Sequence, residues 1–453
     1  MKILPHILSP ISSYFVKILL RFYQVFIFIL TPVWFIWLLL RLSQKKELIT
    51  RLCERWGKST VQKPHGSLLW IHAASVGESL SALPLIKKIQ EYSPDLNILM
   101  TTGTVTSARL MAGRLPQNVI HQFFPMDMLL FVHRFLSYWR PDGVLWLESE
   151  LWPTMLSETR QKKIPMALVN ARLSPKSFQR WQRFPVIADF LLRQFNICLA
   201  QSGEMAFHLK SLGAQHVRMP GNLKYASPPL PVDLHELAQI KKKLKMRVIL
   251  CVASTHPGEE EKIFYVHQKI KQHLPNFLTI LVPRHPERGQ EIKEAGLRKN
   301  LTVSRRSLQE PIYSQTDIYL ADTLGELGLF YRLSPIVLMG GTLMPIGGHN
   351  PLEPALLDCA LLWGRHMENF SEISHRFIQE KAAIQLSTEE EIIQALLDLI
   401  KHPKKVKALQ RNAQNLAKSE QCVLDHILDD IRPFFPFLTP AFLNLEKEEK
   451  KNV

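Results

Sequence analysis

The sequence predicts an α/β protein built from two doubly wound domains in tandem, preceded by an apolar helix. From residue 68 onward, short apolar runs alternate with amphipathic stretches of helix length. This alternation is typical of parallel strands joined by crossover helices. A proline-rich stretch, YASPPLPVD at 225–233, interrupts the pattern, which then restarts. We therefore expect two such domains with a central cleft between them.

Length and composition exclude several classes of protein. The chain has 453 residues, 46% hydrophobic and 21% charged, so it is neither a peptide-sized binding module nor largely disordered. Its five cysteines are scattered and form no CxxC pair, which argues against a disulfide framework or a zinc site. The net charge of +16 favours an anionic partner, whether nucleic acid, a phospholipid surface or a phosphorylated substrate.

Residues 1–50 are expected to form a membrane anchor region. Residues 23–40, YQVFIFILTPVWFIWLLL, carry no formal charge over the length needed to cross a bilayer in a single helix. No small-residue cleavage site follows, which disfavours a signal peptide, and a soluble core helix is the other alternative. Basic residues after the segment favour a cytoplasmic position for the rest of the chain. Because Pro32 interrupts the segment, a helix that only dips into the membrane stays open as an alternative.

The first domain is expected over residues 51–228. Its apolar runs are too short for helices and bounded by turn residues, so they are predicted to be buried strands. These runs lie at 68–73, 97–102, 143–148, 166–171 and 196–201.

A linker is expected at 229–245, followed by the second domain over 246–420. Residues 403–431 have a helical pattern, and 421–453 are expected to hold the end of that helix and a charged tail. The predicted strands of the second domain lie at 247–255, 277–285, 317–322, 334–341 and 359–364.

Glu78 is the first candidate site residue, because ligands of open parallel sheets bind beyond the carboxyl ends of the strands. It lies in HAASVGES, directly after the strand expected at 68–73. A carboxylate here would repel phosphate, and the GxxxxGK[ST] arrangement of a P-loop is missing. It therefore suits a base for an incoming hydroxyl, although a helix-capping carboxylate is the simpler alternative.

Two further groups follow strands of the first domain. Glu148 and Glu150 lie in LESELWP, and only one of them would face the cleft if the backbone is extended. Lys224, in GNLKYA, could supply positive charge to a leaving group or an anionic substrate, with a surface lysine as the alternative.

In the second domain, VPRHPER presents Arg284, whose planar guanidinium suits a nucleotide phosphate. DTLGELGL places Gly325, Glu326 and Leu327 at a helix start, where free N–H groups can bind an anion.

The last candidate loop of the second domain is glycine-rich. MGGTLMPIGGHNPLEPALL leads into a helix with Asn350 and Glu353, and a carboxylate there can accept hydrogen bonds from ribose hydroxyls. His349 and Glu353 lack a third ligand, so no metal site is expected.

The ordered motifs HAASVGES, ESELWP, NARLS, GNLKYA, PRHPER, DTLGEL and GGHNPLEP resemble those of the 3-deoxy-D-manno-octulosonic acid (Kdo) transferases of Gram-negative bacteria. The resemblance implies a GT-B glycosyltransferase of two Rossmann-like domains. It implies an inverting enzyme that moves Kdo from CMP-Kdo to the lipid A precursor (lipid IVA) on the cytoplasmic side of the inner membrane, without a metal or other cofactor.

The resemblance also implies roles for individual residues. Glu78 matches the proton acceptor, and Glu148 and Lys224 match residues that stabilise the transition state. The residues that match CMP-binding segments are Pro283, Arg284, Gly325, Glu326, Leu327, Asn350, Pro351, Leu352 and Glu353.

Two alternatives stay open at this point. The chain could be another GT-B transferase or an epimerase that uses a different nucleotide sugar. It could also be a non-catalytic, membrane-tethered binder of anionic ligands, although no nucleic-acid motif is present and nucleic acid is not an expected partner.

A basic segment at 160–193 is expected to face the anionic membrane or a phosphorylated acceptor. Phe178, Trp181 and Phe184 are interleaved with its charges and could enter the membrane interface. A solvated helix face is the alternative.

Overall fold

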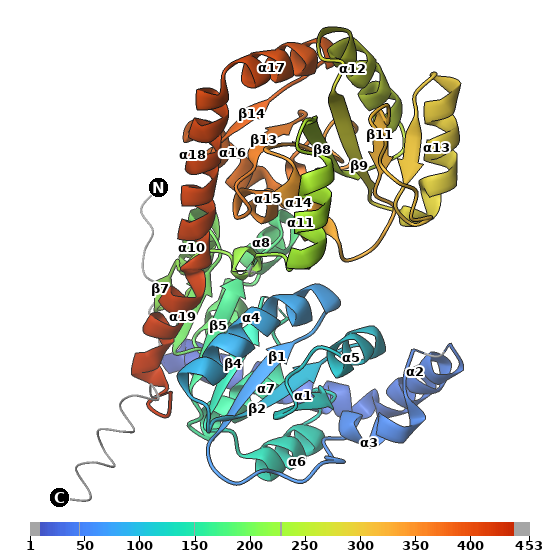
Figure 1. Cartoon of the computed structure of the whole chain (residues 1–453). Helices are drawn as coiled ribbons and strands as arrows, with labels where there is room; N and C mark the ends of the chain where they lie inside the picture. Colours follow the sequence, from blue (N-terminus) through green and yellow to red (C-terminus); the bar gives the residue numbers. More distant parts are fainter. Residues whose placement is uncertain (1–9, 45, 149, 227–228, 439–453) are drawn as a thin grey trace, which may run out of the picture. The chain divides into compact units, whose positions relative to one another are not determined.

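The computed structural model describes residues 10–44, 46–148, 150–226 and 229–438. It divides into two compact units, one of residues 1–227 with 422–453 and one of residues 228–421. Among the described residues, each unit holds one seven-stranded sheet whose strand pairs are all parallel (Figure 1). The predicted α/β class with two doubly wound sheets is therefore confirmed. The expected charged tail at 439–453 lies outside the described residues.

The first sheet has the strand order β3-β2-β1-β4-β5-β6-β7. Its strands are β1 (Leu68–Ala73), β2 (Asn97–Thr102), β3 (Val119–Phe123), β4 (Gly143–Leu147), β5 (Met166–Ala171), β6 (Ile197–Ala200) and β7 (Val217–Arg218). Its helices are α3 (Leu52–Arg55), α4 (Val76–Tyr92), α5 (Val105–Ala112), α6 (Leu129–Trp139), α7 (Pro153–Gln161), α8 (Pro175–Gln182), α9 (Pro185–Leu192), α10 (Gly203–Ser211) and α19 (Val423–Ile431), with short 3-10 turns at Ile49–Arg51, Leu223–Tyr225 and Arg432–Phe434.

The second sheet has the order β10-β11-β9-β8-β12-β13-β14. Its strands are β8 (Val248–Thr255), β9 (Phe277–Pro283), β10 (Val303–Arg305), β11 (Ile318–Leu320), β12 (Ile336–Met339), β13 (Ala360–Trp363) and β14 (Ala383–Gln385). Its helices are α11 (Leu234–Lys243), α12 (Glu259–His273), α13 (Gly289–Arg298), α14 (Leu327–Leu333), α15 (Leu352–Ala355), α16 (Ser371–Gln379), α17 (Glu389–Lys401) and α18 (Pro403–Gln421), with 3-10 turns at Pro286–Arg288 and Glu368–Phe370.

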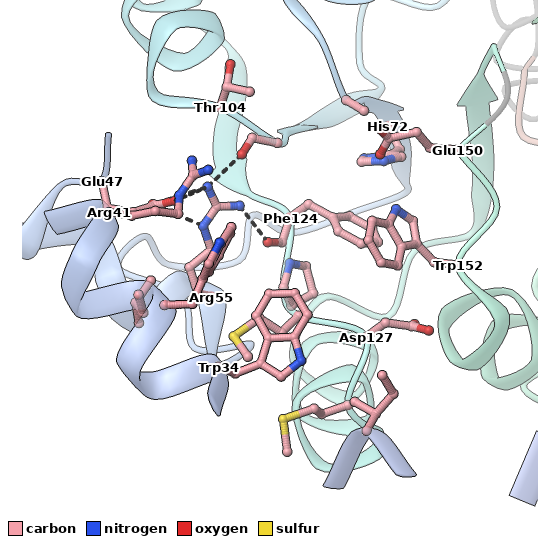
Figure 2. Close-up of a pocket in the computed structure, with 18 of the residues that line it drawn as sticks. Trp34, Arg41, Glu47, Arg55, His72, Thr104, Phe124, Asp127, Glu150 and Trp152 are labelled. Atoms are coloured by element: carbon pink, nitrogen blue, oxygen red, sulfur yellow. Dashed lines mark hydrogen bonds and ion pairs between the residues drawn. The ribbon is translucent and has the colours of Figure 1, made fainter. Parts of the chain in front are cut away.

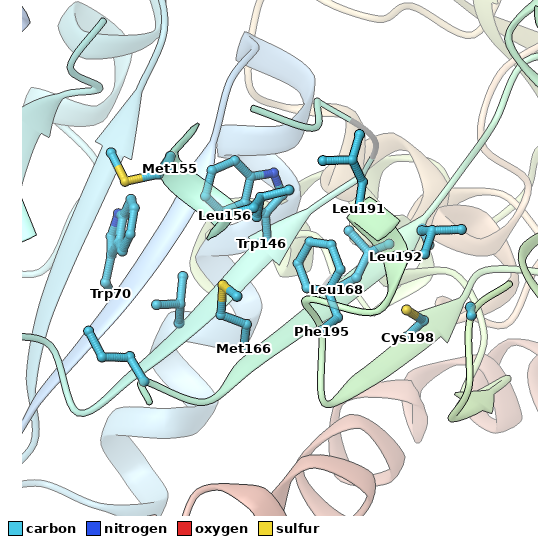
Figure 3. Packing of buried hydrophobic residues seen from close by; sticks show 14 of the residues in the cluster. Trp70, Trp146, Met155, Leu156, Met166, Leu168, Leu191, Leu192, Phe195 and Cys198 are labelled. Carbon is cyan, nitrogen blue, oxygen red and sulfur yellow. The ribbon is translucent and has the colours of Figure 1, made fainter. Parts of the chain in front are cut away.

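Central strands of the first sheet are apolar at every position because both faces of the sheet are covered. In β1, Leu68 and Trp70 join one hydrophobic cluster, while Leu69 and Ile71 join the cluster on the other face. Figure 3 shows the first cluster, in which Trp70 lies with Trp146, Met155 and Leu168. Successive side chains point to opposite faces, so a strand buried on both faces becomes a continuous apolar run.

Four strands that the sequence analysis missed are the four edges of the two sheets. They are β3, β7, β10 and β14, with the sequences VIHQF, VR, VSR and AIQ. An edge strand has one neighbour and is less buried, so it needs no continuous apolar run. The missed strands are therefore short and mixed in polarity.

Two segments near the unit boundaries are helical. Residues 229–245 contain α11, which packs against α14 in the second unit. The helical pattern at 403–431 forms two helices, α18 and α19, which meet at Cys422. Of these, α19 belongs to the first unit and packs on α4, where Lys88 pairs with Asp425 at 2.7 Å.

The expected single apolar helix over residues 23–40 is wrong, because the chain forms two helices there. These are α1 (Pro10–Ile29) and α2 (Thr31–Ser43), which meet at a bend of 55°. Pro32 has no N–H to bond the Phe28 carbonyl, and the Thr31 hydroxyl donates to that carbonyl instead. Within the described residues, no single helix has the length and apolarity to cross a membrane, whereas this bent pair passes the same test as a pair.

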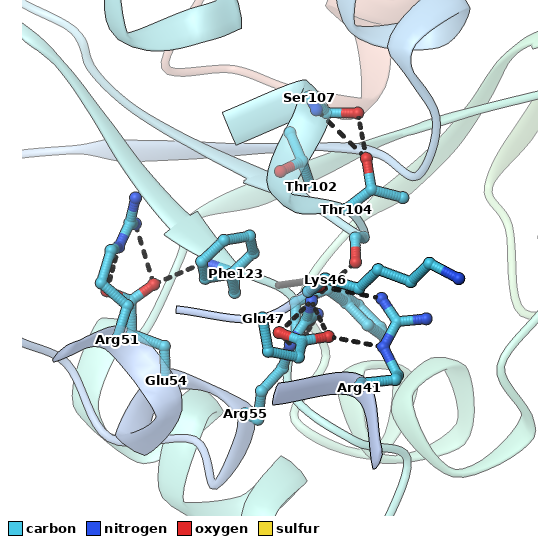
Figure 4. A network of polar contacts seen from close by, with 12 residues as sticks. Arg41, Lys46, Glu47, Arg51, Glu54, Arg55, Thr102, Thr104, Ser107 and Phe123 are labelled. Atoms are coloured by element: carbon cyan, nitrogen blue, oxygen red, sulfur yellow. Dashed lines mark hydrogen bonds and ion pairs between the residues drawn. The ribbon is translucent and has the colours of Figure 1, made fainter. Parts of the chain in front are cut away.

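Buried ion pairs attach the chain after α2 to the first sheet (Figure 4). The Arg55 guanidinium donates to the Gly103 carbonyl at 2.7 Å, to the Phe124 carbonyl at 3.1 Å and to the Glu47 carboxylate at 3.2 Å. Glu47 also accepts from Arg41, the last basic residue of α2, at 3.0 Å. The bent helix pair is therefore fixed at its end to the loops that follow β2 and β3.

Candidate active site

Glu78 lies in the first turn of α4, directly after β1, and is 7% exposed. Its carboxylate accepts hydrogen bonds from the Ala74 amide at 2.7 Å and from the Ser75 hydroxyl at 2.8 Å. In return, the Ser75 hydroxyl accepts from the Glu78 amide at 3.3 Å, which is a reciprocal helix cap. Glu78 thus has the helix-capping role considered from the sequence, and if it is also the base, the same carboxylate performs both roles.

The pKa of Glu78 is raised from its ordinary range. Burial is the main cause, and the negative charges of Glu148 and Glu150 add to it, while the hydrogen bonds from Ser75 and Ala74 act in the opposite direction. A carboxylate with a raised pKa is a stronger proton acceptor than an exposed one. A raised pKa is compatible with a general base, which stays a prediction for Glu78.

The structure brings Glu148 and Lys224 into contact. The Lys224 ammonium lies 3.2 Å from the Glu148 carboxylate, and the Glu148 side chain is only 16% exposed. Glu148 directly follows β4 and has a φ of 58°, which is unusual for a residue other than glycine. Such strain is retained where the surroundings impose it and is concentrated at functional sites.

Asn170, which the sequence analysis did not single out, positions this pair. It lies in β5 with a φ of 56°, and its side-chain oxygen accepts the Leu223 amide at 3.0 Å, next to Lys224. Asn170 is the first residue of the NARLS motif, which the sequence analysis quoted. Because it lies inside an apolar strand, its role in holding the turn of Lys224 was not recognised. It fixes the start of the turn that presents Lys224.

Next to these residues, Glu150 contributes to a pocket of about 250 Å³ in the first unit (Figure 2). Burial raises the pKa of Glu150, and the Trp152 indole opposes this rise. Ala74, whose amide holds Glu78, lines the same pocket. The pocket thus extends the region around Glu78 toward α1 and α2.

In the second unit, three predicted donor-site residues lie close together beyond the strand ends. The Asn350 side-chain oxygen accepts the Leu352 amide at 3.1 Å, and its side-chain amide lies 3.4 Å from the Glu353 carboxylate. Burial raises the pKa of Glu353, while Asn350 and the charge of Arg284 lower it. Arg284 is exposed, and its guanidinium forms no hydrogen bond or ion pair with any described residue. This guanidinium is therefore available to a ligand.

The other residues predicted for the donor site lie at the ends of strands and helices, and one of them, Glu326, is paired within the protein. Pro283 ends β9, and Pro351 directly precedes α15, which begins at Leu352. Gly325 has a φ of 83° and open space around it, and Leu327 begins α14. The Glu326 carboxylate, however, pairs with Arg306 and the Thr323 hydroxyl. A ligand of this turn would therefore meet backbone groups rather than a free Glu326 carboxylate.

The Glu259 carboxylate, which the sequence analysis missed, orders the glycine-rich loop after β12. Glu259 is 1% exposed and accepts the amides of Gly341 at 2.7 Å, Leu343 at 3.0 Å and His256 at 2.9 Å. A Cβ on Gly340 would lie 2.4 Å from the Ser254 carbonyl oxygen, so only glycine permits this approach. Glu259 follows β8, and the strand-end rule used for the other loops would have found it.

Two histidines complete this edge of the second sheet. The Nε2 atoms of His256 and His349 are 3.0 Å apart, so one imidazole donates to the other. Burial and the charge of Arg284 contribute to lowering the pKa of His349 to about 4. Over the described part of the chain, no group of three or more His, Cys, Asp or Glu side chains is placed to hold a metal ion.

The basic segment at 160–193 forms α8, α9 and the end of α7. Lys176, Arg180 and Arg183 are exposed, as expected, and Phe184 is 54% exposed. Phe178 and Trp181, in contrast, pack partly buried against the core. Packing against the core therefore uses part of the surface of these two side chains, and entry of the three aromatic residues into a membrane interface stays a prediction.

The chain is similar in sequence to known proteins over most of its length. Residues 50–227 match the family described as 3-deoxy-D-manno-octulosonic-acid transferase (kdotransferase). The 3-deoxy-D-manno-octulosonic acid transferase of Rickettsia bellii is 34% identical over 92% of this chain and 100% of that protein. The transferase of the same name from Haemophilus influenzae is 30% identical over 85% of this chain and 91% of that protein.

Among solved structures, a glycosyltransferase from Rickettsia africae aligns with a TM-score of 0.54 at 12% identity, covering 82% of this chain and 99% of that chain. At this identity the likeness concerns the fold alone, and it agrees with the predicted GT-B class. The identity and coverage of the sequence relatives show the family: the chain belongs to the 3-deoxy-D-manno-octulosonic acid transferases and is a glycosyltransferase.

Proposed function

We propose that this chain transfers Kdo from CMP-Kdo to the lipid A precursor (lipid IVA) during lipopolysaccharide synthesis. One observation carries the proposal beyond family membership: the ion pair of Glu148 and Lys224 lies near Glu78, whose pKa responds to the Glu148 charge. A base and a cation held together beyond the ends of parallel strands suit the transfer of an activated sugar to a hydroxyl.

On the acceptor side, Glu78 would take the proton of the attacking hydroxyl. The hydroxyl oxygen then forms a bond to the anomeric carbon of Kdo, with inversion. The bond from that carbon to the CMP phosphate oxygen breaks, and its electron pair leaves with the phosphate. Lys224 would stabilise the negative charge that develops, and Glu148 holds the Lys224 ammonium in position, at 3.2 Å.

On the donor side, the second unit would bind the CMP group. The free Arg284 guanidinium suits the phosphate, to which it can donate two parallel hydrogen bonds. Glu353, held by Asn350 at 3.4 Å, suits the ribose hydroxyls. The proposal requires no metal or further cofactor.

The bent pair α1 and α2 would attach the enzyme to the cytoplasmic side of the inner membrane. Phe22, Phe28 and Ile36 on these helices are 68%, 70% and 61% exposed, which is unusual for large apolar side chains. Together with the exposed cations of α8, this surface suits an anionic bilayer.

The release of CMP tests the proposal. The purified chain should release CMP from CMP-Kdo only when lipid IVA is present, and CMP should raise its unfolding temperature more than UDP does. Protection by UDP with no effect of CMP would favour the alternative of a different nucleotide sugar. Binding of CMP-Kdo and lipid IVA without turnover would favour the non-catalytic alternative.

A further inference from the structure

The pocket of about 250 Å³ in the first unit has room for part of a lipid rather than a whole one. Sites for drug-sized ligands usually measure about 300–1,000 Å³. Much of its wall is aromatic, with Trp34 and Trp37 from α2, Phe124 after β3 and Trp152 after β4 (Figure 2). An apolar group fits these walls.

Several charged groups in the wall are paired within the protein, whereas Glu150 lines the pocket without a described ion pair. Glu47 pairs with Arg41 at 3.0 Å and with Arg55 at 3.2 Å. Asp127 accepts the Tyr23 hydroxyl at 3.1 Å and the Met155 amide at 2.7 Å. These paired charges stabilise the wall, and the remaining carboxylate, that of Glu150, disfavours an anionic ligand.

His72 differs from the other polar groups of the wall. It is 1% exposed, and its Nδ1 lies 2.9 Å from the Thr101 hydroxyl, which also accepts the Trp70 indole at 2.8 Å. Its Nε2 is buried and has no hydrogen-bond partner within the described chain. Leaving such an atom unpaired is unfavourable, so a ligand group that pairs with it would bind more tightly.

The neutral form of His72 limits what that ligand group can be. Burial lowers the pKa of His72 to about 3, so the imidazole is uncharged near neutral pH. Its Nε2 then either donates or accepts, depending on the tautomer. A hydroxyl group can do both and satisfies either tautomer.

The position of the pocket indicates from which side an apolar ligand with a hydroxyl group would enter. Tyr23 and Ile27 of α1 line one part of it, and Ala74, whose amide is held by Glu78, lines another. In Figure 2, His72, Glu150 and Trp152 gather on one side, and Trp34 and Arg55 lie on the other. A lipid taken from the side of α1 and α2 would thus place its polar end toward Glu78.

We propose that this pocket holds one acyl chain of the acceptor lipid and that the His72 Nε2 hydrogen-bonds a hydroxyl group on that chain. The inference rests on the proposed function for the identity of the acceptor. The pocket selects a hydroxylated chain over a plain one, and it aligns the acceptor headgroup with Glu78.

The binding of a chain is measured without catalysis. Bromoundecanol and bromoundecane have the same chain, and bromine quenches tryptophan fluorescence on contact, with three tryptophans in the pocket wall. Quenching of the full-length chain should saturate, with the alcohol bound about two- to tenfold more tightly, the factor of one net hydrogen bond. His72→Phe should remove this preference while keeping the ring contacts with Phe124 and Trp146, at 4.1 and 4.4 Å between centroids.

Absence of saturable quenching in the parent overturns the chain site, and a preference for the alcohol that survives in His72→Phe overturns the hydroxyl contact. A near-ultraviolet circular dichroism spectrum like that of the parent shows that His72→Phe is folded. Should His72→Phe fail to fold, His72→Leu, which also lacks a hydrogen-bonding group, replaces it as the test of the hydroxyl contact, and Ile27→Trp tests the chain site, because filling the pocket should abolish saturable quenching by both probes.

The link to the acceptor is measured with kinetics. Ile27→Trp should raise the KM for lipid IVA at least about tenfold and leave the KM for the fully deacylated, phosphorylated disaccharide unchanged. Val25→Trp is the matched control: Val25 lies on the same helix, is 56% exposed and does not line the pocket, so it should behave like the parent. Equal KM values for lipid IVA in the two variants overturn the inference, whereas a parent that transfers Kdo to neither acceptor overturns the proposed function itself.

Discussion

Glu78→Gln separates the catalytic role of Glu78 from its capping role. The amide oxygen of glutamine can still accept the Ala74 amide, and its NH₂ group can donate to the Ser75 hydroxyl, so both contacts of the carboxylate have a replacement. We expect little loss of stability, within about 1 kcal/mol, the value of one hydrogen bond. Loss of a general base should nevertheless lower turnover at least about a hundredfold, or about 2.7 kcal/mol in activation free energy.

Glu78→Ala is the matched control, because it removes the base and the cap together. It should lose turnover to a similar extent and, in addition, about 0.5–2 kcal/mol of stability in urea unfolding. Initial rates with CMP-Kdo and lipid IVA, and CMP affinity by calorimetry, complete the comparison. Because the pKa of Glu78 is raised, turnover of the parent should fall as the pH falls through a value above the ordinary 4.5 of glutamate, and Glu78→Gln should lack this fall. Near-normal turnover in Glu78→Gln would refute the assignment of Glu78 as the base.

Three further predictions concern the donor, the membrane and the N-terminal helices. Arg284→Ala should weaken CMP binding by about 1.5–3 kcal/mol, measured by calorimetry, without loss of stability, and an unchanged affinity would remove Arg284 from the site. Replacing Lys176, Arg180 and Arg183 with Gln should weaken binding to anionic liposomes, more at low salt than at high, and parent-like binding at low salt would exclude this surface. Burial raises the pKa of Asp127 from 3.8 to about 6, so the folded state holds its proton to higher pH than the unfolded state does. Stability against urea should therefore fall by up to about 3 kcal/mol as the pH rises from about 4 to about 6, and a fall of equal size in Asp127→Asn would contradict this.

The sequence predicts the centre of each sheet well because both faces of the central strands are buried. The run LLWIHA at 68–73 coincides with β1, and MALVNA at 166–171 coincides with β5. Edge strands such as VR and AIQ follow no such rule. Hydrogen bonds to one neighbouring strand determine that they are extended, and their amino-acid composition does not reveal it. The bend between α1 and α2 depends on one missing hydrogen bond at Pro32. The sequence shows this proline but does not show how far the helix bends there.

The candidate site was predictable where a residue directly follows a central strand. Glu78 and Glu148 follow this rule, and the contact of Glu148 with Lys224 then comes from the fold, since the two residues lie far apart in sequence. The occupied carboxylate of Glu326 was not predictable, because its partner Arg306 follows β10, an edge strand that the pattern did not reveal. Asn170 was not found because it lies inside the apolar run of β5, and the sequence does not reveal its left-handed backbone.

Mass spectrometry of the lipid product tests the central claim most directly. The purified chain is incubated with lipid IVA and either CMP-Kdo or CMP-sialic acid, the second being a CMP-activated sugar acid of a different kind. We predict that lipid IVA gains the mass of one or more Kdo residues with CMP-Kdo alone, and that Glu78→Gln forms this product at least about a hundredfold more slowly. Unmodified lipid IVA after complete consumption of CMP-Kdo, or a product formed equally fast by Glu78→Gln, would contradict the account.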